Sequence, residues 1–399
     1  MSLAFDGIRI IDFTQVLAGP FGVMQLALLG AEVIKVEQPG TGDQTRGLMN
    51  TGDDIGMSPS FMGMNLNKKS ITLNLKSPEA VEIIKKLVVD TDVVVENFKA
   101  GTMERMGLGF DDLSVIKPDL IYCSVTGYGQ TGPKAGEAAY DGAIQASSGM
   151  MSQTGHVETG PTRTGFMPVD MSTALNTAFA ISAALHRKAK TGKGQRIDLA
   201  MMDTAIVMQA AQYSNYLNQG SLIGLLGNAS PTRQPTANVF PTRDGQIQVT
   251  ALRQPQVEKL FNALGKGEVL SRPEFSSPEQ RVKNTPLVNE FMCNALQEQT
   301  TAYWMKILAG AGVPVAEIRE LPEVVKDPQF DHRGVFETIP SPSNENETVT
   351  LVKAGFTTNE DGPSVRHGPP MLGEHTNEVL GSIGLSIDEI QAYRDKGVV

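Results

Sequence analysis

The sequence predicts an α/β protein built mainly on a parallel β-sheet, with a smaller α+β segment late in the chain. In the first half, short apolar strands alternate with amphipathic helices. Between about residues 220 and 317, a hairpin and a group of helices replace this alternation. The chain has 399 residues, more than one hydrophobic core usually organises, so at least two compact parts are expected.

The first strand–helix–strand repeat covers residues 8–37. "IRIIDFTQV" is apolar enough for a buried strand, and Pro20 and Gly30 mark the start and end of the following helix. A second repeat follows, with Ser77 as the N-cap of its helix. Short crossovers of this kind predict parallel strands with right-handed connections. The expected strands are Ile8–Val16, Ala31–Glu37, Ser70–Leu75, Asp92–Phe98 and Leu120–Gly129.

A long apolar helix from Asp170 to Lys190 opens the second half, and a short strand leading into a helix follows over 195–217. The composition of residues 220–236 is typical of a linker, and a hairpin turning at Asp244-Gly245 comes next. Further helices are expected over 256–264, 287–297, 302–311, 374–383 and 386–396, and residues 313–334 are expected to return to α/β character as one strand and one helix.

Composition narrows the class of partner. The formal net charge of −10 argues against nucleic acid as the main ligand. No apolar run is long enough to span a membrane, and the first residues lack the pattern of a signal peptide. Cys123 and Cys293 lie far apart and are expected to be reduced, buried thiols, which favours a cytoplasmic protein.

Several common cofactor motifs are missing from the sequence. The turn after the first strand reads "VLAGPFG" instead of the glycine pattern of dinucleotide sites, and "AKTGKGQ" is too short for a Walker motif. The five histidines form no HExxH, so no metal site is expected, and the serine-hydrolase pattern GxSxG does not occur.

Asp170 is the candidate catalytic residue, and the sequence around it leaves its role open. An aspartate before an apolar helix is usually an N-cap. A carboxylate at a helix N-terminus is also expected to stay ionised, because the terminal amides stabilise negative charge. Such a carboxylate could attack an acyl thioester and form a mixed anhydride, with nearby amides stabilising the oxyanion. The pattern alone does not separate capping from catalysis.

Seven ordered blocks of sequence resemble the class III coenzyme A transferases, the family of formyl-CoA and carnitine CoA transferases. The match is weakest over about 220–317. The blocks are "DFTQVLAGPFGVMQLALLGAEVIKVEQPGTGDQTRG" (12–47), "NLNKKSITLNLKS" (65–77), "VVVENFKAGTMERMGL" (93–108), "YDGAIQASSGMMSQTG" (140–155), "KTGKGQRIDLAMMDTAI" (190–206), "DPQFDHRG" (327–334) and "GEHTNEVL" (373–380).

This resemblance implies a fold and a reaction. The implied fold is a Rossmann-like large domain formed by residues 1–219 and 318–399, with a small α+β domain over 220–317, in an interlocked homodimer. Asp170 falls on the family's catalytic aspartate, which passes through a mixed anhydride and an aspartyl-CoA thioester. Acyl-CoA and a small carboxylate are the implied substrates, and no tightly bound cofactor is needed.

The resemblance also implies CoA contacts, some of which depart from the formyl-CoA branch. Gln38 stands where that branch has an arginine, and Ala138 where it has a lysine. The branch's glycine-rich loop has no obvious counterpart in "LLGNASPTRQP", so oxalate specificity is not expected. The implied CoA-contacting residues are Val16, Leu17, Ala18, Gln38, Leu73, Asn74, Leu75, Lys76, Asn97, Phe98, Lys99, Arg105, Ala138, Tyr140 and Asp141.

Two alternatives stay open beside the transferase. The related α-methylacyl-CoA racemase uses a histidine just before an aspartate, whereas this chain has Tyr140-Asp141, and a tyrosine is a poor base at neutral pH. Tyr140 is expected to be a packing aromatic with a satisfied hydroxyl more than a catalytic group. A non-catalytic CoA-binding protein with the same fold is the second alternative, and an intact Asp170 argues against it.

Overall fold

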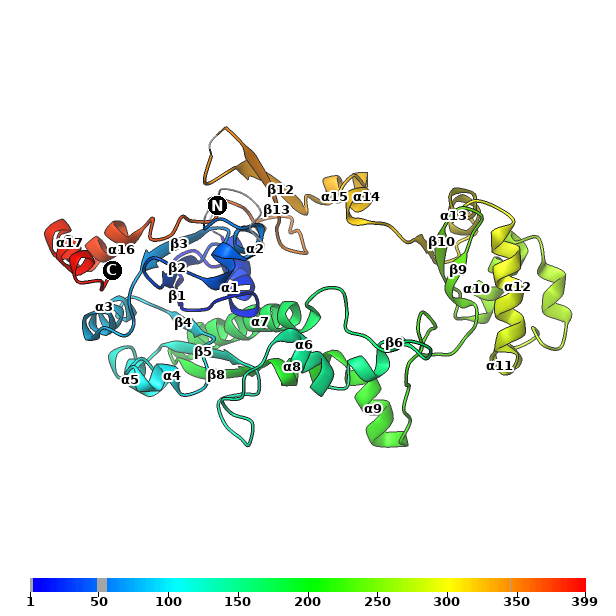
Figure 1. Ribbon diagram of the computed structural model, residues 1–399, viewed down its shortest axis with the longest axis horizontal. Helices are drawn as coiled ribbons and strands as arrows, with labels where there is room; N and C mark the ends of the chain where they lie inside the picture. The colour runs from blue at the N-terminus through cyan, green and yellow to red at the C-terminus, as the bar shows by residue number, and fades with distance from the viewer. Residues whose placement is uncertain (1–2, 49–55, 345) are drawn as a thin grey trace. The chain divides into compact units, whose positions relative to one another are not determined.

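The computed structural model describes residues 3–48, 56–344 and 346–399, and Figure 1 shows its course. The chain divides into two compact units. The large unit combines three stretches, Met1–Ser148, Thr164–Tyr213 and Pro328–Val399, and therefore includes both ends of the chain. The small unit combines Gly149–Arg163 with Ser214–Asp327.

A six-stranded sheet forms the centre of the large unit, with strand order β3-β2-β1-β4-β5-β8. Every neighbouring pair in it is parallel, as the short crossovers predict. The order reverses between β1 and β4, so the ends of these two strands flank a topological switch point. The strands are β1 (Arg9–Asp12), β2 (Glu32–Glu37), β3 (Lys68–Thr72), β4 (Val93–Glu96), β5 (Ile121–Thr126) and β8 (Gln195–Ala200).

Helices cover both faces of this sheet, which explains its near-continuous apolar strands. Alternate strand residues enter different cores: Ile10 belongs to the core beneath α1 (Ala18–Leu28) and α7 (Pro168–Thr191), while Ile11 belongs to the opposite one. The opposite core is completed by α3 (Pro78–Val88), α5 (Phe110–Ile116), α16 (Thr376–Ser382) and α17 (Ile387–Asp395). Ser77 caps α3 by accepting from the Glu79 amide, which confirms that prediction.

The close approach of α1 and α7 depends on Gly22. A Cβ atom at this position would lie 2.5 Å from the carbonyl oxygen of Ala174, nearer than packed atoms allow. Glycine therefore lets the two helices pack together beside the sheet, and both begin at the edge where the parallel strands end.

The small unit holds a separate antiparallel sheet of β9 (Ala237–Pro241), β10 (Gln246–Thr250) and β11 (Val315–Glu317). The predicted hairpin is confirmed, since β9 and β10 pair across the turn that contains Asp244-Gly245. The expected return to α/β character at residue 313 is wrong, because β11 pairs antiparallel with β10. Around this sheet lie α10 (Gln254–Ala263), α11 (Pro278–Lys283), α12 (Thr285–Gln297) and α13 (Thr301–Gly310).

Residues 320–334 form two short helices instead of the single helix expected. They are α14 (Leu321–Val324) and α15 (Pro328–Arg333). Pro328 explains the break, because a residue before proline is disfavoured in the helical region.

An antiparallel hairpin that the sequence patterns did not predict follows, formed by β12 (Phe336–Pro340) and β13 (Thr348–Val352). The remaining elements are η1 (Gln44–Gly47), α2 (Pro59–Met62), α4 (Thr102–Arg105), α6 (Asp141–Ser147), η2 (Met151–Gln153), β6 (Gly155–His156), β7 (Gly160–Pro161), α8 (Met201–Met208), α9 (Ala210–Gln219) and η3 (Gly267–Ser271).

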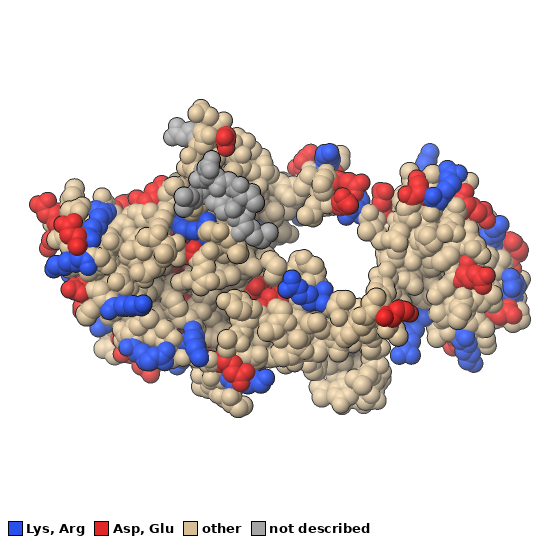
Figure 2. Space-filling model, in the orientation of Figure 1, with Lys and Arg blue, Asp and Glu red and all other residues tan. Residues whose placement is uncertain are grey.

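Charges of both signs are mixed on the surface that Figure 2 shows, where Lys and Arg side chains are interspersed with Asp and Glu. Within the described ranges, none of the helices combines the length and apolar character that crossing a membrane requires. Cys123 is fully buried, while Cys293 is only half-buried, contrary to the expectation for the second thiol.

Candidate active site

A cavity of about 360 Å³ lies in the large unit at the switch point of the sheet. Its walls include Gln15–Ala18, which follow β1, and Asn97–Ala100, which follow β4. The end of β5 and Tyr140 also line it, and so does Asp170. Open α/β sheets bind ligands at such points, so the fold itself places the candidate site there.

Asp170 does not cap α7, so the capping interpretation of this residue is wrong. The N-cap is Met167, and Pro168 opens the helix, which places Asp170 in the first turn as its third residue. Asp141 supplies the cap instead. Its Oδ2 accepts the backbone N–H groups of Val169 at 2.8 Å and of Asp170 at 3.0 Å.

Gln145 completes this arrangement by tying Asp141 to the chain that leads into α7. Its side-chain amide donates to Asp141, and its Oε1 accepts from the backbone N–H of Thr164 at 3.1 Å. Asp141 and Gln145 are both buried and lie one turn apart on α6. The cap is thus held by a second helix.

Because Asp141 caps α7, the carboxylate of Asp170 is not used as a cap and lies half-buried beside the cavity. Among the described residues, none donates a hydrogen bond to this carboxylate. Burial raises the pKa of Asp170 to about 6, and the negative charge of Asp141 adds to that effect. The expected cause of ionisation is therefore wrong: two of the helix amides bond Asp141, and the pKa of Asp170 is raised instead of lowered. At neutral pH the group is still mainly a carboxylate, poorly solvated and unpaired.

The structure brings together about half of the CoA-contacting residues that the resemblance implies. Those lining the cavity with Asp170 are Val16, Leu17, Ala18, Asn97, Phe98, Lys99, Ala138 and Tyr140. Those outside its lining are Gln38, Leu73, Asn74, Leu75, Lys76, Arg105 and Asp141. Their roles stay predictions.

The environments of the outlying residues differ. The side chain of Leu73 packs in the core of the large unit. Arg105 donates to the hydroxyl of Thr102 at 2.9 Å, and the side chain of Asn74 donates to the Gly397 carbonyl. The carboxylate of Asp141 is occupied by the cap of α7, so it is committed to structure.

Tyr140 does not pack inside the protein, contrary to expectation. Its side chain is 67% exposed, and it stands at the N-cap of α6 on the wall of the cavity. The interpretation as a packing aromatic failed because Tyr140 precedes α6, whose buried residues are Asp141, Ile144 and Gln145.

Sequence reasoning missed several residues of the cavity wall. Gln15, Gln44, Tyr128 and Glu137 line it beside the predicted residues. Gln15 and Tyr128 could have been found, because each is the second-last residue of a predicted strand, at the edge of the parallel sheet where ligands bind. Gln44 and Glu137 lie in loops whose course no periodic pattern specifies.

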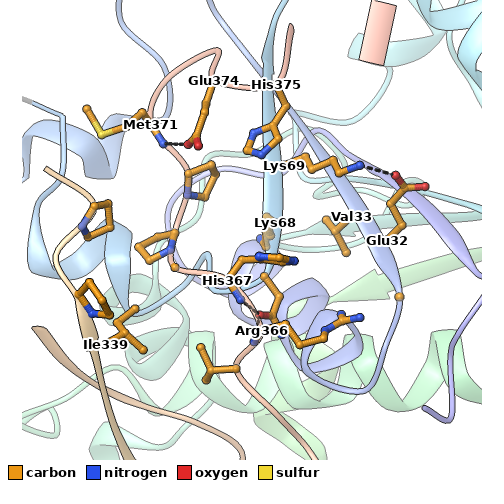
Figure 3. A pocket seen from close by; sticks show the side chains of 18 of the residues that line it. Glu32, Val33, Lys68, Lys69, Ile339, Arg366, His367, Met371, Glu374 and His375 are labelled. Carbon is orange, nitrogen blue, oxygen red and sulfur yellow. Dashed lines mark hydrogen bonds and ion pairs between the residues drawn. The ribbon is translucent and has the colours of Figure 1, made fainter. Parts of the chain in front are cut away.

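A larger cavity, of about 840 Å³, lies beside the first residues of β2 and β3. Figure 3 shows Lys69 turned toward Glu32 on its wall, and Lys69 Nζ lies 2.9 Å from Glu32 and 2.7 Å from Glu378. These charges neutralise one another, and the lining holds no counterpart to the unpaired Asp170. Nowhere in the described ranges do three His, Cys, Asp or Glu side chains gather as metal ligands would.

Comparison with known proteins decides the family. A sequence model of CoA-transferase family III matches residues 5–376. This chain belongs to CoA-transferase family III. It is 36% identical to the succinyl-CoA:glutarate CoA-transferase of Homo sapiens over 411 residues, which cover 98% of this chain and 87% of that protein.

Bacterial relatives extend the similarity to sequence and structure. The chain is 34% identical to a succinate–glutarate CoA-transferase of Agrobacterium fabrum, over 95% of each chain. A crystal structure of a CaiB/BaiF family protein from Brucella suis matches with a TM-score of 0.85 and 32% identity, over 96% of this chain and 100% of the other. The family III protein described here is an enzyme, an acyl-CoA:carboxylate CoA-transferase.

Proposed function

We propose that Asp170 is the nucleophile of this transfer. One carboxylate oxygen attacks the thioester carbonyl of the donor, the C–S bond breaks, and CoA leaves as the thiolate. That thiolate attacks the Asp170 carbonyl of the resulting anhydride, which releases the donor acid and forms an aspartyl-CoA thioester. The acceptor carboxylate then attacks this thioester, and the displaced thiolate takes the acceptor's acyl group.

The observation that carries the proposal is the half-buried, uncapped carboxylate of Asp170 on the wall of a cavity. A carboxylate in bulk water is a weak nucleophile because its hydration must be removed, and burial has removed part of it here. The pKa of about 6 keeps the group mainly ionised at neutral pH while marking its poor solvation. The start of α1 lines the same cavity, so its terminal amides are candidates to stabilise the oxyanion.

The proposed substrates are a short acyl-CoA donor and a small carboxylate acceptor, and dicarboxylates are the preferred candidates. Two relatives that cover most of this chain carry succinate and glutarate in their names, which supports this choice. The first assay should therefore pair succinyl-CoA with glutarate. Later assays should test succinyl-CoA with a panel of other carboxylic acids, and glutarate with other acyl-CoA donors.

Trapping with hydroxylamine during turnover tests the proposal directly. A hydroxamate at Asp170, found by mass spectrometry of the digested protein, is the expected result. Asp170→Asn should give no adduct and no transfer while binding CoA. An absent adduct in the wild-type protein under every donor would support a non-catalytic CoA-binding protein instead. Deuterium uptake at the α-carbon without acyl transfer would support the racemase alternative.

We further propose that the enzyme is a homodimer, interlocked as the family resemblance implies. Large apolar side chains are exposed on two helices that pack together: Leu175 and Phe179 on α7, and Val207 on α8, with 55%, 71% and 67% of their surfaces exposed. Exposed apolar groups of this size typically mark a contact surface. Light scattering should report twice the chain mass, and mixed tagged and untagged dimers should not exchange chains without unfolding.

A further inference from the structure

Val16 has a backbone conformation that valine rarely adopts. Its φ is 72°, and it is the one β-branched residue with positive φ in the described part of the chain. Side chains branched at Cβ are disfavoured there, so the surrounding structure must hold this residue in place. Val16 also lines the cavity together with Asp170.

Side chains from two other elements hold the backbone at this point. The N–H of Val16 donates to Asp43 Oδ1 at 3.2 Å, and the second oxygen of Asp43 lies 2.9 Å from Lys35 Nζ. On the other side, Asn97 brackets Gln15, accepting from its N–H at 2.9 Å and donating to its carbonyl at 2.8 Å. Adjacent residues of one loop are therefore fixed by separate partners.

Two buried lysines hold the carbonyl groups on either side of this loop. Lys35 Nζ donates to the carbonyl of Thr14 at 2.6 Å. Lys68 Nζ donates to the carbonyl of Pro20 at 2.9 Å and pairs with Asp12, which accepts from the N–H of Thr14. Hydrogen bonds from lysines thus hold the backbone on both sides of Val16.

The pair formed by Asp43 and Lys35 is suited to positioning because neither side chain reaches solvent. Burial is the largest single effect and by itself would raise the pKa of Asp43 and lower the pKa of Lys35. The charges of Asp43, Asp12 and Glu37 together raise the pKa of Lys35, and the charge of Lys35 with the hydrogen bonds from Thr45 lowers the pKa of Asp43, so both stay ionised. A buried ion pair contributes little net stability, whereas it fixes geometry well.

We infer that Asp43 is a positioning residue for the transfer: through Lys35 and the N–H of Val16, it holds the β1–α1 loop in the strained conformation that forms the cavity wall alongside Asp170. This inference rests on the proposed function of Asp170. Asp43 does not line the cavity, and its Oδ1 also accepts from the N–H and the hydroxyl of Thr45, at 2.9 Å and 2.8 Å. An asparagine at this position could accept from Val16 or from Lys35, but not from both.

Two substitutions of Val16 test the inference, and thermal unfolding shows whether each variant is folded. Val16→Gly keeps the N–H and tolerates positive φ, whereas Val16→Pro loses the N–H and cannot adopt positive φ. Val16→Pro should lower kcat by about a hundredfold relative to Val16→Gly, which serves as the reference because it also lacks the valine side chain. The KM for acyl-CoA should differ by less than about threefold between these two variants.

Asp43→Asn adds a test by rescue. It should lower kcat by about tenfold in the wild-type background and much less in the Val16→Gly background, because glycine adopts the conformation without being held. Its effect on Tm should be the same in both backgrounds. An equal loss of kcat in both backgrounds, or wild-type kcat in Val16→Pro, would overturn the inference.

Hydrogen exchange separates this inference from the proposed function. Asp43→Asn should speed amide exchange in the peptide covering residues 14–18 and leave the β9–β10 hairpin unchanged. Unchanged exchange over 14–18 refutes the positioning role whether or not the wild-type protein transfers CoA. Absent wild-type transfer with faster exchange refutes only the proposed function.

Discussion

Asp170→Asn should abolish transfer and, at neutral pH, make the protein more stable. The pKa of Asp170 is raised from 3.8 to about 6 in the folded protein. A carboxyl group with a raised folded pKa contributes its stability below the unfolded pKa and loses it as pH rises through the folded pKa. The ionised group therefore costs free energy above pH 6, and an uncharged asparagine removes that cost.

The magnitude follows from the shift of about two pKa units, which corresponds to about 3 kcal/mol for a fully buried group. Partial exposure of Asp170 reduces this to about 1–2 kcal/mol at pH 7. Because the unfolding entropy of a large unit is high, the expected rise in Tm is a few degrees. Near pH 4 the folded wild-type group is protonated, so the two proteins should then have nearly equal Tm values.

Thermal unfolding followed by circular dichroism at pH 7.5 and at pH 4.5 measures both quantities. Asp388→Asn is a suitable control, since Asp388 is an exposed carboxylate in the first turn of α17. That substitution should leave Tm unchanged or slightly lower, because it removes a favourable charge at a helix start. The reasoning fails if Asp170→Asn does not raise Tm at pH 7.5, or raises it equally at both pH values.

Three further outcomes are expected. Asp141→Asn should move the acid limb of kcat, set by Asp170, to lower pH by less than about one unit, because burial is the larger cause of the raised pKa; an unmoved limb would contradict this. Gly22→Ala should cost about 1–3 kcal/mol in urea unfolding, since its Cβ has no room against α7. Lys99→Ala should raise the KM for acyl-CoA about tenfold, whereas Lys86→Ala, at an exposed position of α3 outside the cavity, should change it less than about twofold.

The large unit could be predicted because its signals are local. Ile10 and Ile11 enter opposite cores, so a strand buried on both faces leaves a continuous apolar run that is visible in the sequence. Ser77 begins its helix through a hydrogen bond to a residue two positions away. Short crossovers then fix the parallel direction of the strands. None of these steps needs knowledge of distant residues.

The parts that were missed depend on pairing between distant segments. The strand Val315–Glu317 has no period that distinguishes a parallel from an antiparallel neighbour, and only its contact with β10 decides its place. In the hairpin of β12 and β13, Thr348–Leu351 alternates polar and apolar residues, but this pattern does not identify Phe336–Pro340 as its partner. The strain at Val16 is likewise invisible in the sequence, because nothing near it marks a positive φ.

An aspartate before an apolar helix drew attention to Asp170, but the capping role that this pattern usually indicates is wrong. Asp170 stands where an N-cap is expected, and as a cap its carboxylate would accept hydrogen bonds from backbone amides. Asp141, 29 positions earlier in the chain, takes those amides instead, and this division of labour leaves Asp170 unpaired. The same exchange places a second negative charge beside the nucleophile, which raises the pKa of Asp170 further. If Asp170 capped α7 in place of Asp141, its carboxylate would be stabilised by the helix amides. The free carboxylate on which the proposed transfer depends would then be lost.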